Sequence, residues 1–143
     1  SINQKEARTV DSGPLFNVSD YISLARYAAG AKGERNQIKD PDLIKMTVSS
    51  SLVKGVFEDS ALLLKPLSSY LDNGLYITRV EVRNTSDSKH DLDLSSLSGS
   101  WLAVVKEQPY LSPYKQVVGG LSDQSYLYFV SNKPFERVVV EIR

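Results

Sequence analysis

The sequence contains no cysteine, a single histidine and a single tryptophan among its 143 residues. Without cysteine, the chain forms no disulfide and has neither a thiolate nucleophile nor cysteine-ligated zinc. Its apolar runs, such as Ala61–Leu64 and Trp101–Val105, are far below the roughly 20 residues that a membrane-spanning helix needs. The 17 basic and 17 acidic residues balance, so no overall field draws the chain to nucleic acid or an anionic bilayer. We therefore expect neither nucleic-acid binding nor direct membrane insertion.

The length is that of one domain of ordinary size. Because the chain begins at Ser1 rather than methionine, we expect a processed or trimmed piece of a longer protein. Residues 1–18 show no sustained periodicity. Apolar residues then recur at helical spacing from Ile22 to Ala29, after a possible N-cap at Ser19 or Asp20. The pattern predicts a linker with one helix, about 19–31, over residues 1–45, followed by a β domain over 46–143.

From residue 46 onward the sequence shows strand signals separated by turn residues. The segment 75–83 alternates between Tyr76, Thr78, Val80 and Val82 on one face and charged side chains on the other. Asn73-Gly74 before it is typical of a tight hairpin, and Pro66 is expected to break the preceding strand or place it at an edge. Further strands are predicted at 44–50, 101–105, 126–130 and 135–142.

Six or seven short strands at this spacing predict a mainly β protein. We expect an antiparallel, immunoglobulin-like β-sandwich preceded by the linker and its short helix. The residues predicted for the core are Val80, Val82, Trp101, Ala103, Val105, Tyr128 and Val130.

The segment "KHDLD", Lys89–Asp93, raises the question of a metal or catalytic site. His90 has no second histidine or cysteine to join it, and Asp91 and Asp93 alternate with leucines as the exposed face of a strand does. We interpret His90 as a solvated turn residue. The acidic pairs Asp40/Asp42 and Glu58/Asp59 lie in polar segments where nothing separates their pKa values. We expect no catalytic residues, no metal site and no cofactor, and thus no enzyme.

Two groups of residues are candidates for partner binding. On the strand 75–83, Leu75 and Ile77 share the face of Arg79, and two exposed aliphatic side chains there would be hard to explain in a free monomer. Tyr110 and Tyr114 flank "LSP" in a loop, where they form either a contact surface, a platform for stacking sugars or buried loop anchors. A carbohydrate- or peptide-binding module is accordingly the alternative to an assembly role.

Four separated segments, in this order, resemble the C-terminal half of TraK-like proteins of integrating conjugative elements. They are "LARYAA" (24–29), "GLYITRVEVRNTSD" (74–87), "LDLSSLSGSWLAVV" (92–105) and "LSP…GG…D…YLYFVSNKPFE" (111–136). The resemblance covers about two-thirds of the chain. Residues 30–42 and "QPY" at 108–110 depart from the family pattern, and the family's N-terminal β domain is expected to be missing.

The resemblance implies a structural component of a conjugative type IV secretion system. Such a component is periplasmic and is associated with the outer membrane through its partners. It belongs to the outer-membrane core complex, resembles the secretin-like ring protein there and self-assembles into a ring in the full-length protein. The implied partners are a small outer-membrane lipoprotein and a TonB-like scaffold protein. These are expectations from the family pattern, and they agree with the absence of a catalytic constellation in the sequence.

Overall fold

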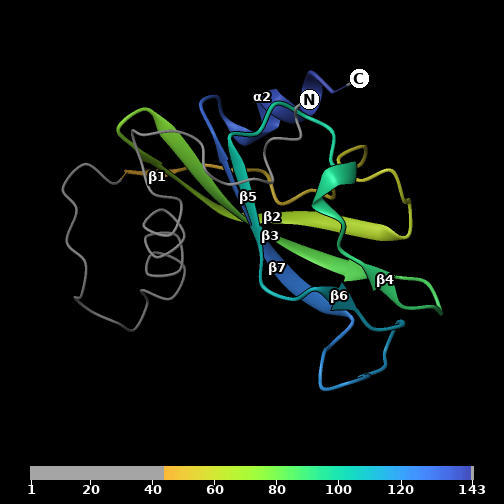
Figure 1. Cartoon of the computed structure of the whole chain (residues 1–143). Coiled ribbons are helices and arrows are strands. Elements are labelled where there is room, and N and C mark those ends of the chain that lie inside the picture. The colour runs from red at the N-terminus through yellow and green to blue at the C-terminus, as the bar shows by residue number, and fades with distance from the viewer. Residues whose placement is uncertain (1–43, 143) are drawn as a thin grey trace, which may run out of the picture.

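The computed structural model describes residues 44–142 and is mainly β, as predicted (Figure 1). Five antiparallel strands form one sheet in the order β1-β2-β3-β7-β5, and β4 pairs with β6 in a separate two-stranded sheet. The elements are β1 (Ile44–Met46), β2 (Leu62–Asp72), β3 (Leu75–Asn84), β4 (His90–Asp91), η2 (Leu94–Ser96), β5 (Ala103–Lys106), β6 (Tyr110–Leu111), β7 (Gln124–Ser131) and α2 (Phe135–Val140). The immunoglobulin-like sandwich stays a prediction. The expected linker and helix at 1–45 lie outside the described residues, except for the first two residues of β1.

The β2–β3 hairpin confirms the turn prediction. Asn73 and Gly74 have φ values of 53° and 84°, the left-handed conformation that a two-residue hairpin turn requires. Both strands are long, and they pair from Leu62↔Asn84 to Asp72↔Leu75. Pro66 does not end β2. The strand instead accommodates proline at a shift in register between Pro66 and Ser68, because a bulge removes the need for a ladder donor.

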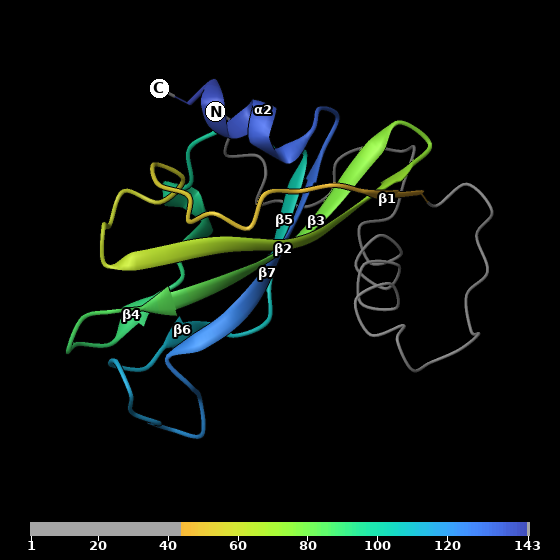
Figure 2. The ribbon, with the colours of Figure 1, turned by 180° about the vertical axis from the view of Figure 1, so that it is seen from behind.

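The first hydrophobic core covers one face of the large sheet. Val80, Val82, Leu127 and Phe129 supply the sheet side, and Trp101 packs on them. The cover comes from residues 56–57, from 92–101 and from α2, which lies at the upper end of the sheet in both ribbon views (Figure 2). The prediction that Val80, Val82 and Trp101 are core residues is confirmed, since none is more than 4% exposed.

A second apolar cluster lies on the opposite face of the same sheet. It contains Ile77, Ala103, Tyr128 and Val130, none more than 1% exposed, with half-buried Val105 packed against it. The predicted burial of Ala103, Tyr128 and Val130 is therefore confirmed. Ile77 was predicted to be exposed, and that was wrong. As β3 is a central strand, both of its faces are covered near Ile77, which lies opposite Val130.

The segment 135–142 was predicted to be a strand but forms helix α2 over Phe135–Val140. Pro134 precedes it, where proline's fixed φ and missing N–H suit the start of a helix. Phe135 and Val138, three residues apart, are buried, whereas Val140 is 66% exposed. The β-branched run "VVV" favours a strand locally, and the packing of one helical face on the first core overrides that preference.

Within residues 44–142, no helix is long and apolar enough to cross a membrane.

Candidate docking loop

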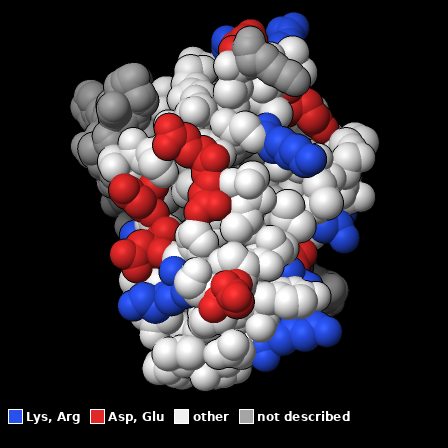
Figure 3. All heavy atoms as spheres, turned by 90° about the vertical axis from the view of Figure 1, so that its right-hand side faces the viewer, with Lys and Arg blue, Asp and Glu red and all other residues white. Residues whose placement is uncertain are grey.

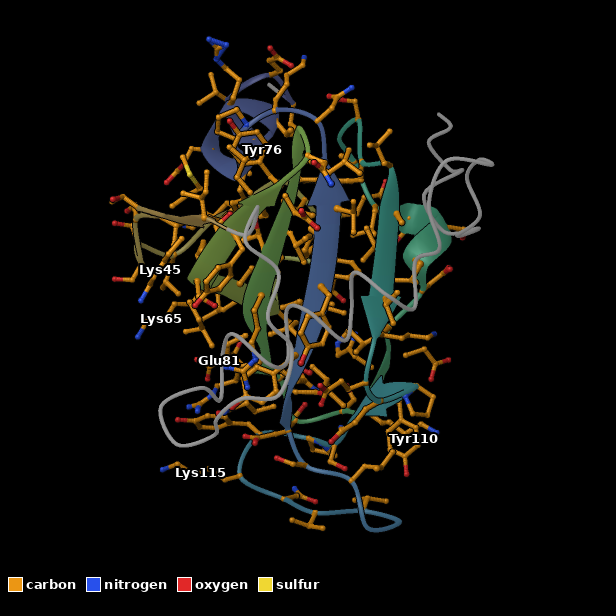
Figure 4. All side chains as sticks on the ribbon, turned by 90° about the vertical axis from the view of Figure 1, so that its left-hand side faces the viewer. Lys45, Lys65, Tyr76, Glu81, Tyr110 and Lys115 are labelled. Carbon is orange, nitrogen blue, oxygen red and sulfur yellow. The ribbon has the colours of Figure 1, made fainter. Side chains whose placement is uncertain are left out.

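The five residues predicted to bind partners fall into separate places. Leu75 is half-buried next to the β2–β3 turn, and Tyr110 lies in β6 near the other end of the molecule. Figure 4 shows this separation, with Tyr76 at the upper end and Tyr110 and Lys115 at the lower end. The structure therefore does not bring the two groups together, and the loop that carries Tyr114 is the better exposed of the two.

Arg79 is held against the sheet rather than extended into water. Its guanidinium carbon lies 4.0 Å from the centre of the Tyr126 ring. Stacking of this kind stabilises by about 0.5–2 kcal/mol and fixes the side chain. The solvent-exposed strand face that we expected here is not present, because Leu75 and Arg79 are half-buried and Ile77 is buried.

Residues 112–123, which we name the Tyr114 loop, join β6 to β7 and contain a tight turn. Val118 and Leu121 exchange two backbone hydrogen bonds of 3.2 and 3.1 Å across Gly119-Gly120. The glycines have φ values of 63° and 82°. A Cβ at Gly119 would lie 2.5 Å from the Tyr110 hydroxyl, so both the backbone conformation and the space require glycine here.

The base of the Tyr114 loop is fastened by polar side chains. The Ser112 hydroxyl accepts from the Val118 N–H at 3.0 Å and donates to the Leu121 carbonyl at 2.7 Å. An Asp123 carboxylate oxygen accepts from the Lys115 N–H at 2.9 Å. Hydrogen bonds of this kind fix the loop before any partner arrives, which lowers the entropy cost of binding.

The tip of this fixed loop is apolar. Val117 is 70% exposed, Val118 42% and Tyr114 41%, so three of the seven large apolar side chains that are exposed in residues 44–142 belong to one loop. In Figure 3 the lower end of the molecule is almost free of charged atoms, and Lys and Arg side chains flank it. An apolar, preorganised projection of this kind is typical of a protein contact.

Sequence reasoning found Tyr110 and Tyr114 but missed Val117 and Val118. The signal was present in "VVGG", where two valines precede a Gly-Gly turn. An exposed valine pair at a turn was therefore the missed feature.

The two tyrosine rings do not form an open platform. The Lys89 ammonium lies 4.5 Å from the centre of the Tyr110 ring, and the Lys115 ammonium lies 5.3 Å from that of Tyr114. The Tyr110 hydroxyl donates to the Val118 carbonyl at 2.9 Å, so this side chain anchors the loop. A sugar stacking on the rings would have to displace the ammonium groups, and this geometry favours a loop anchor and a protein contact over sugar binding.

His90 lies in β4 rather than in a turn. It pairs with Leu111 of β6, and its Nδ1 lies 2.9 Å from an Asp59 carboxylate oxygen. In the part of the chain that the structure describes, no group of three or more His, Asp or Glu side chains is placed to hold a metal ion. His90 therefore joins β4 to the loop that carries Asp59.

A family model matches residues 4–142 and carries the description "Protein of unknown function (DUF3438)". The chain belongs to the DUF3438 family. The match includes every described residue, so the large sheet, α2 and the Tyr114 loop are all parts of the DUF3438 domain. No curated protein matches the chain.

The geometry of the Tyr114 loop suits recognition by shape. Burying a valine side chain completely contributes about 1.5–3 kcal/mol, and the loop offers two exposed valines beside the apolar ring of Tyr114. With the backbone already fixed, a partner that supplies a matching apolar hollow would gain most of that free energy.

Proposed function

We propose that the chain is a structural docking component of a conjugative type IV secretion system. In this role it holds partner subunits in the outer-membrane core complex and is periplasmic, associated with the outer membrane through those partners. The proposed partners are a small outer-membrane lipoprotein and a TonB-like scaffold protein, and the full-length protein self-assembles into a ring. The role is non-enzymatic and uses no cofactor.

The resemblance to TraK-like proteins supports the secretion context, and its motifs coincide with framework elements. "GLYITRVEVRNTSD" contains the glycine of the hairpin turn and all of β3, and "LDLSSLSGSWLAVV" contains η2 and Trp101. "YLYFVSNKPFE" contains most of β7 and the start of α2. The shared residues are therefore mainly those that build the sheet and its first core, as expected where function lies in surfaces.

The observation that carries the docking role is the Tyr114 loop. It exposes Tyr114, Val117 and Val118 together. Its conformation is fixed by the Ser112 hydroxyl, which donates to the Leu121 carbonyl, and by the Asp123 carboxylate, which accepts from the Lys115 N–H. A free monomer gains nothing from an apolar projection held in this way, whereas a subunit of a larger assembly buries it.

Replacing Val117 by aspartate is expected to abolish capture of the partner proteins. The side chain is 70% exposed, so the fold tolerates the charge, but a carboxylate in an apolar interface has no partner and weakens binding by at least about tenfold. The measurement is a crosslinking pull-down from the envelope of conjugating donor cells, read by mass spectrometry. Val140→Asp is the matched control, because Val140 is 66% exposed on a different element.

Recovery of the lipoprotein and the TonB-like scaffold with the wild-type chain and with Val140→Asp, but not with Val117→Asp, supports the proposal. Recovery of neither protein by a folded wild-type chain would overturn the secretion role. Equal recovery by all three chains would show that the Tyr114 loop is not the docking surface.

A further inference from the structure

The second face of the large sheet carries an apolar cluster that is closed off from water. It contains Ile77, Ala103, Tyr128 and Val130, which are at most 1% exposed. The half-buried apolar side chains packed against this cluster belong to the strands themselves or to the residue before β5, namely Leu75, Leu102, Val105 and Tyr126. One face of a sheet does not bury itself, so burial this complete needs a second layer.

The layer that the structure describes covers the other face. Residues 56–57, 92–101 and α2 pack on the first core. Figure 4 looks onto the second face, and there no helix or loop from residues 44–142 crosses β3 and β7. The second layer is therefore not supplied by the described part of the chain.

Two polar side chains on the same face are also buried. Tyr70 lies opposite Ile77 in the β2–β3 pairing and is 9% exposed, and burial raises the pKa of Tyr70. The Nε atom of Arg79 is buried, although the stacked ring of Tyr126 covers only one side of the guanidinium. An arginine on an open sheet face would keep its head group in water. The missing layer therefore extends across the sheet from β2 to β5.

We propose that residues 1–43 of the same chain supply this layer and close the second face of the sheet. The segment leads directly into Ile44 at the start of β1, which is an edge strand of that sheet. This connection holds the segment close to the face and makes its docking intramolecular, so a weak apolar contact is sufficient. The inference concerns the chain alone and does not depend on the proposed secretion role.

The helix predicted at about 19–31 has the length and the polarity that this face requires. A helix of this length is about 20 Å long, whereas the strands from β2 to β5 span about 15 Å, so it can cross the whole cluster. The cluster and the side chains packed against it include no charged residue. The apolar residues of the predicted helix fall on one side and are mostly small, which lets a helix lie close to the strands; they are Ile22, Leu24, Ala25, Ala28 and Ala29.

The absence of cysteine lets one introduced thiol report on this layer in the full 143-residue chain. Ala103→Cys places the thiol in the cluster, and Val140→Cys places it at a position that is 66% exposed. We expect iodoacetamide to alkylate the first thiol at least about 100-fold more slowly than the second, because a buried thiol reacts only when the structure opens. Equal rates in the two folded chains would overturn the inference.

A charge in the predicted helix should expose the same thiol. Added to Ala103→Cys, Ala25→Asp should speed alkylation at least about tenfold, because a carboxylate finds no partner on the apolar cluster. Ser23→Asp is the matched control, since position 23 lies on the opposite side of the predicted helix and should leave the rate unchanged. The same rate with and without Ala25→Asp, or an equal rise with Ser23→Asp, would contradict the proposal.

Crosslinking identifies which molecule supplies the layer. Ala25→Cys is combined with Leu75→Cys or with Val105→Cys, since both positions are half-buried and packed against the cluster. Val140→Cys on α2 is the control for the second position. A short bismaleimide should link position 25 to 75 or 105 within one chain, and not to 140. Links between two chains would show that a second copy covers the face, and no link to 75 or 105 would show that another molecule does; either result would overturn the proposal.

Discussion

Alanine at position 101 is expected to lower the free energy of unfolding by about 3–5 kcal/mol, enough to unfold most of a marginally stable domain. Trp101 is 4% exposed. The centre of its ring lies 4.6 Å from that of Phe129, in an edge-on arrangement, and 5.3 Å from that of Phe135, in a stacked one. Trp101 therefore joins β7 to α2. Truncation leaves a cavity between these elements and removes the aromatic contacts as well as the buried area.

The backbone around Trp101 is adapted to that ring. The indole N–H donates to the Ser98 carbonyl at 2.7 Å, and a Cβ at Gly99 would lie 2.6 Å from the indole nitrogen. Urea denaturation followed by circular dichroism measures the change, and Tyr114→Ala serves as the exposed aromatic control, expected to alter stability by at most about 0.5 kcal/mol. A Trp101→Ala chain that folds normally but loses partner binding would contradict the assignment of Trp101 to the core.

Leucine at position 84 is expected to destabilise the chain by about 3 kcal/mol, although the two side chains are similar in size. Asn84 is fully buried at the end of β3. Its amide donates to the carbonyls of Ser88 at 2.8 Å and Ser112 at 3.0 Å, and its carbonyl accepts from the Ser86 N–H at 2.9 Å. Leucine leaves all three groups without this partner, and the hydrogen bond to the Ser112 carbonyl is buried, so water does not replace it.

The Asn84 change should also loosen the Tyr114 loop. Asn84 holds Ser112 at the base of that loop, and the Ser86 carbonyl accepts from the Tyr114 N–H at 2.8 Å. Hydrogen exchange at the Tyr114 amide should therefore become faster in Asn84→Leu and stay unchanged in Asn132→Leu, where the residue is exposed. Unchanged exchange in the first variant would mean that the loop is held without Asn84.

Local patterns in the sequence were sufficient to predict the hairpin and the main strands. Asn73-Gly74 specifies its turn through backbone conformation, and alternation along β3 specifies which side chains enter the first core. The sequence patterns gave a wrong prediction where tertiary packing determines the secondary structure or the burial of a residue. The "VVV" of α2 favours a strand until Phe135 and Val138 are packed on the first core, and no local signal tells that Ile77 is buried in a central strand.

The candidate site was predicted only in part, for a similar reason. Tyrosines at loop positions marked Tyr110 and Tyr114, yet Tyr110 turned out to anchor the loop through its hydroxyl. Exposure of Val117 depends on the turn at Gly119-Gly120 and on Ser112, which are contacts between residues that sequence patterns do not pair.

The most direct test of the docking role is site-specific photocrosslinking in conjugating donor cells. A photoreactive amino acid is placed at Val117 in one chain and at Val140 in another, positions that are 70% and 66% exposed. The account predicts a discrete adduct with an envelope protein from position 117 and none from position 140. Adducts from position 140 alone, or from neither position in a folded chain, would contradict the claim that the Tyr114 loop docks a partner.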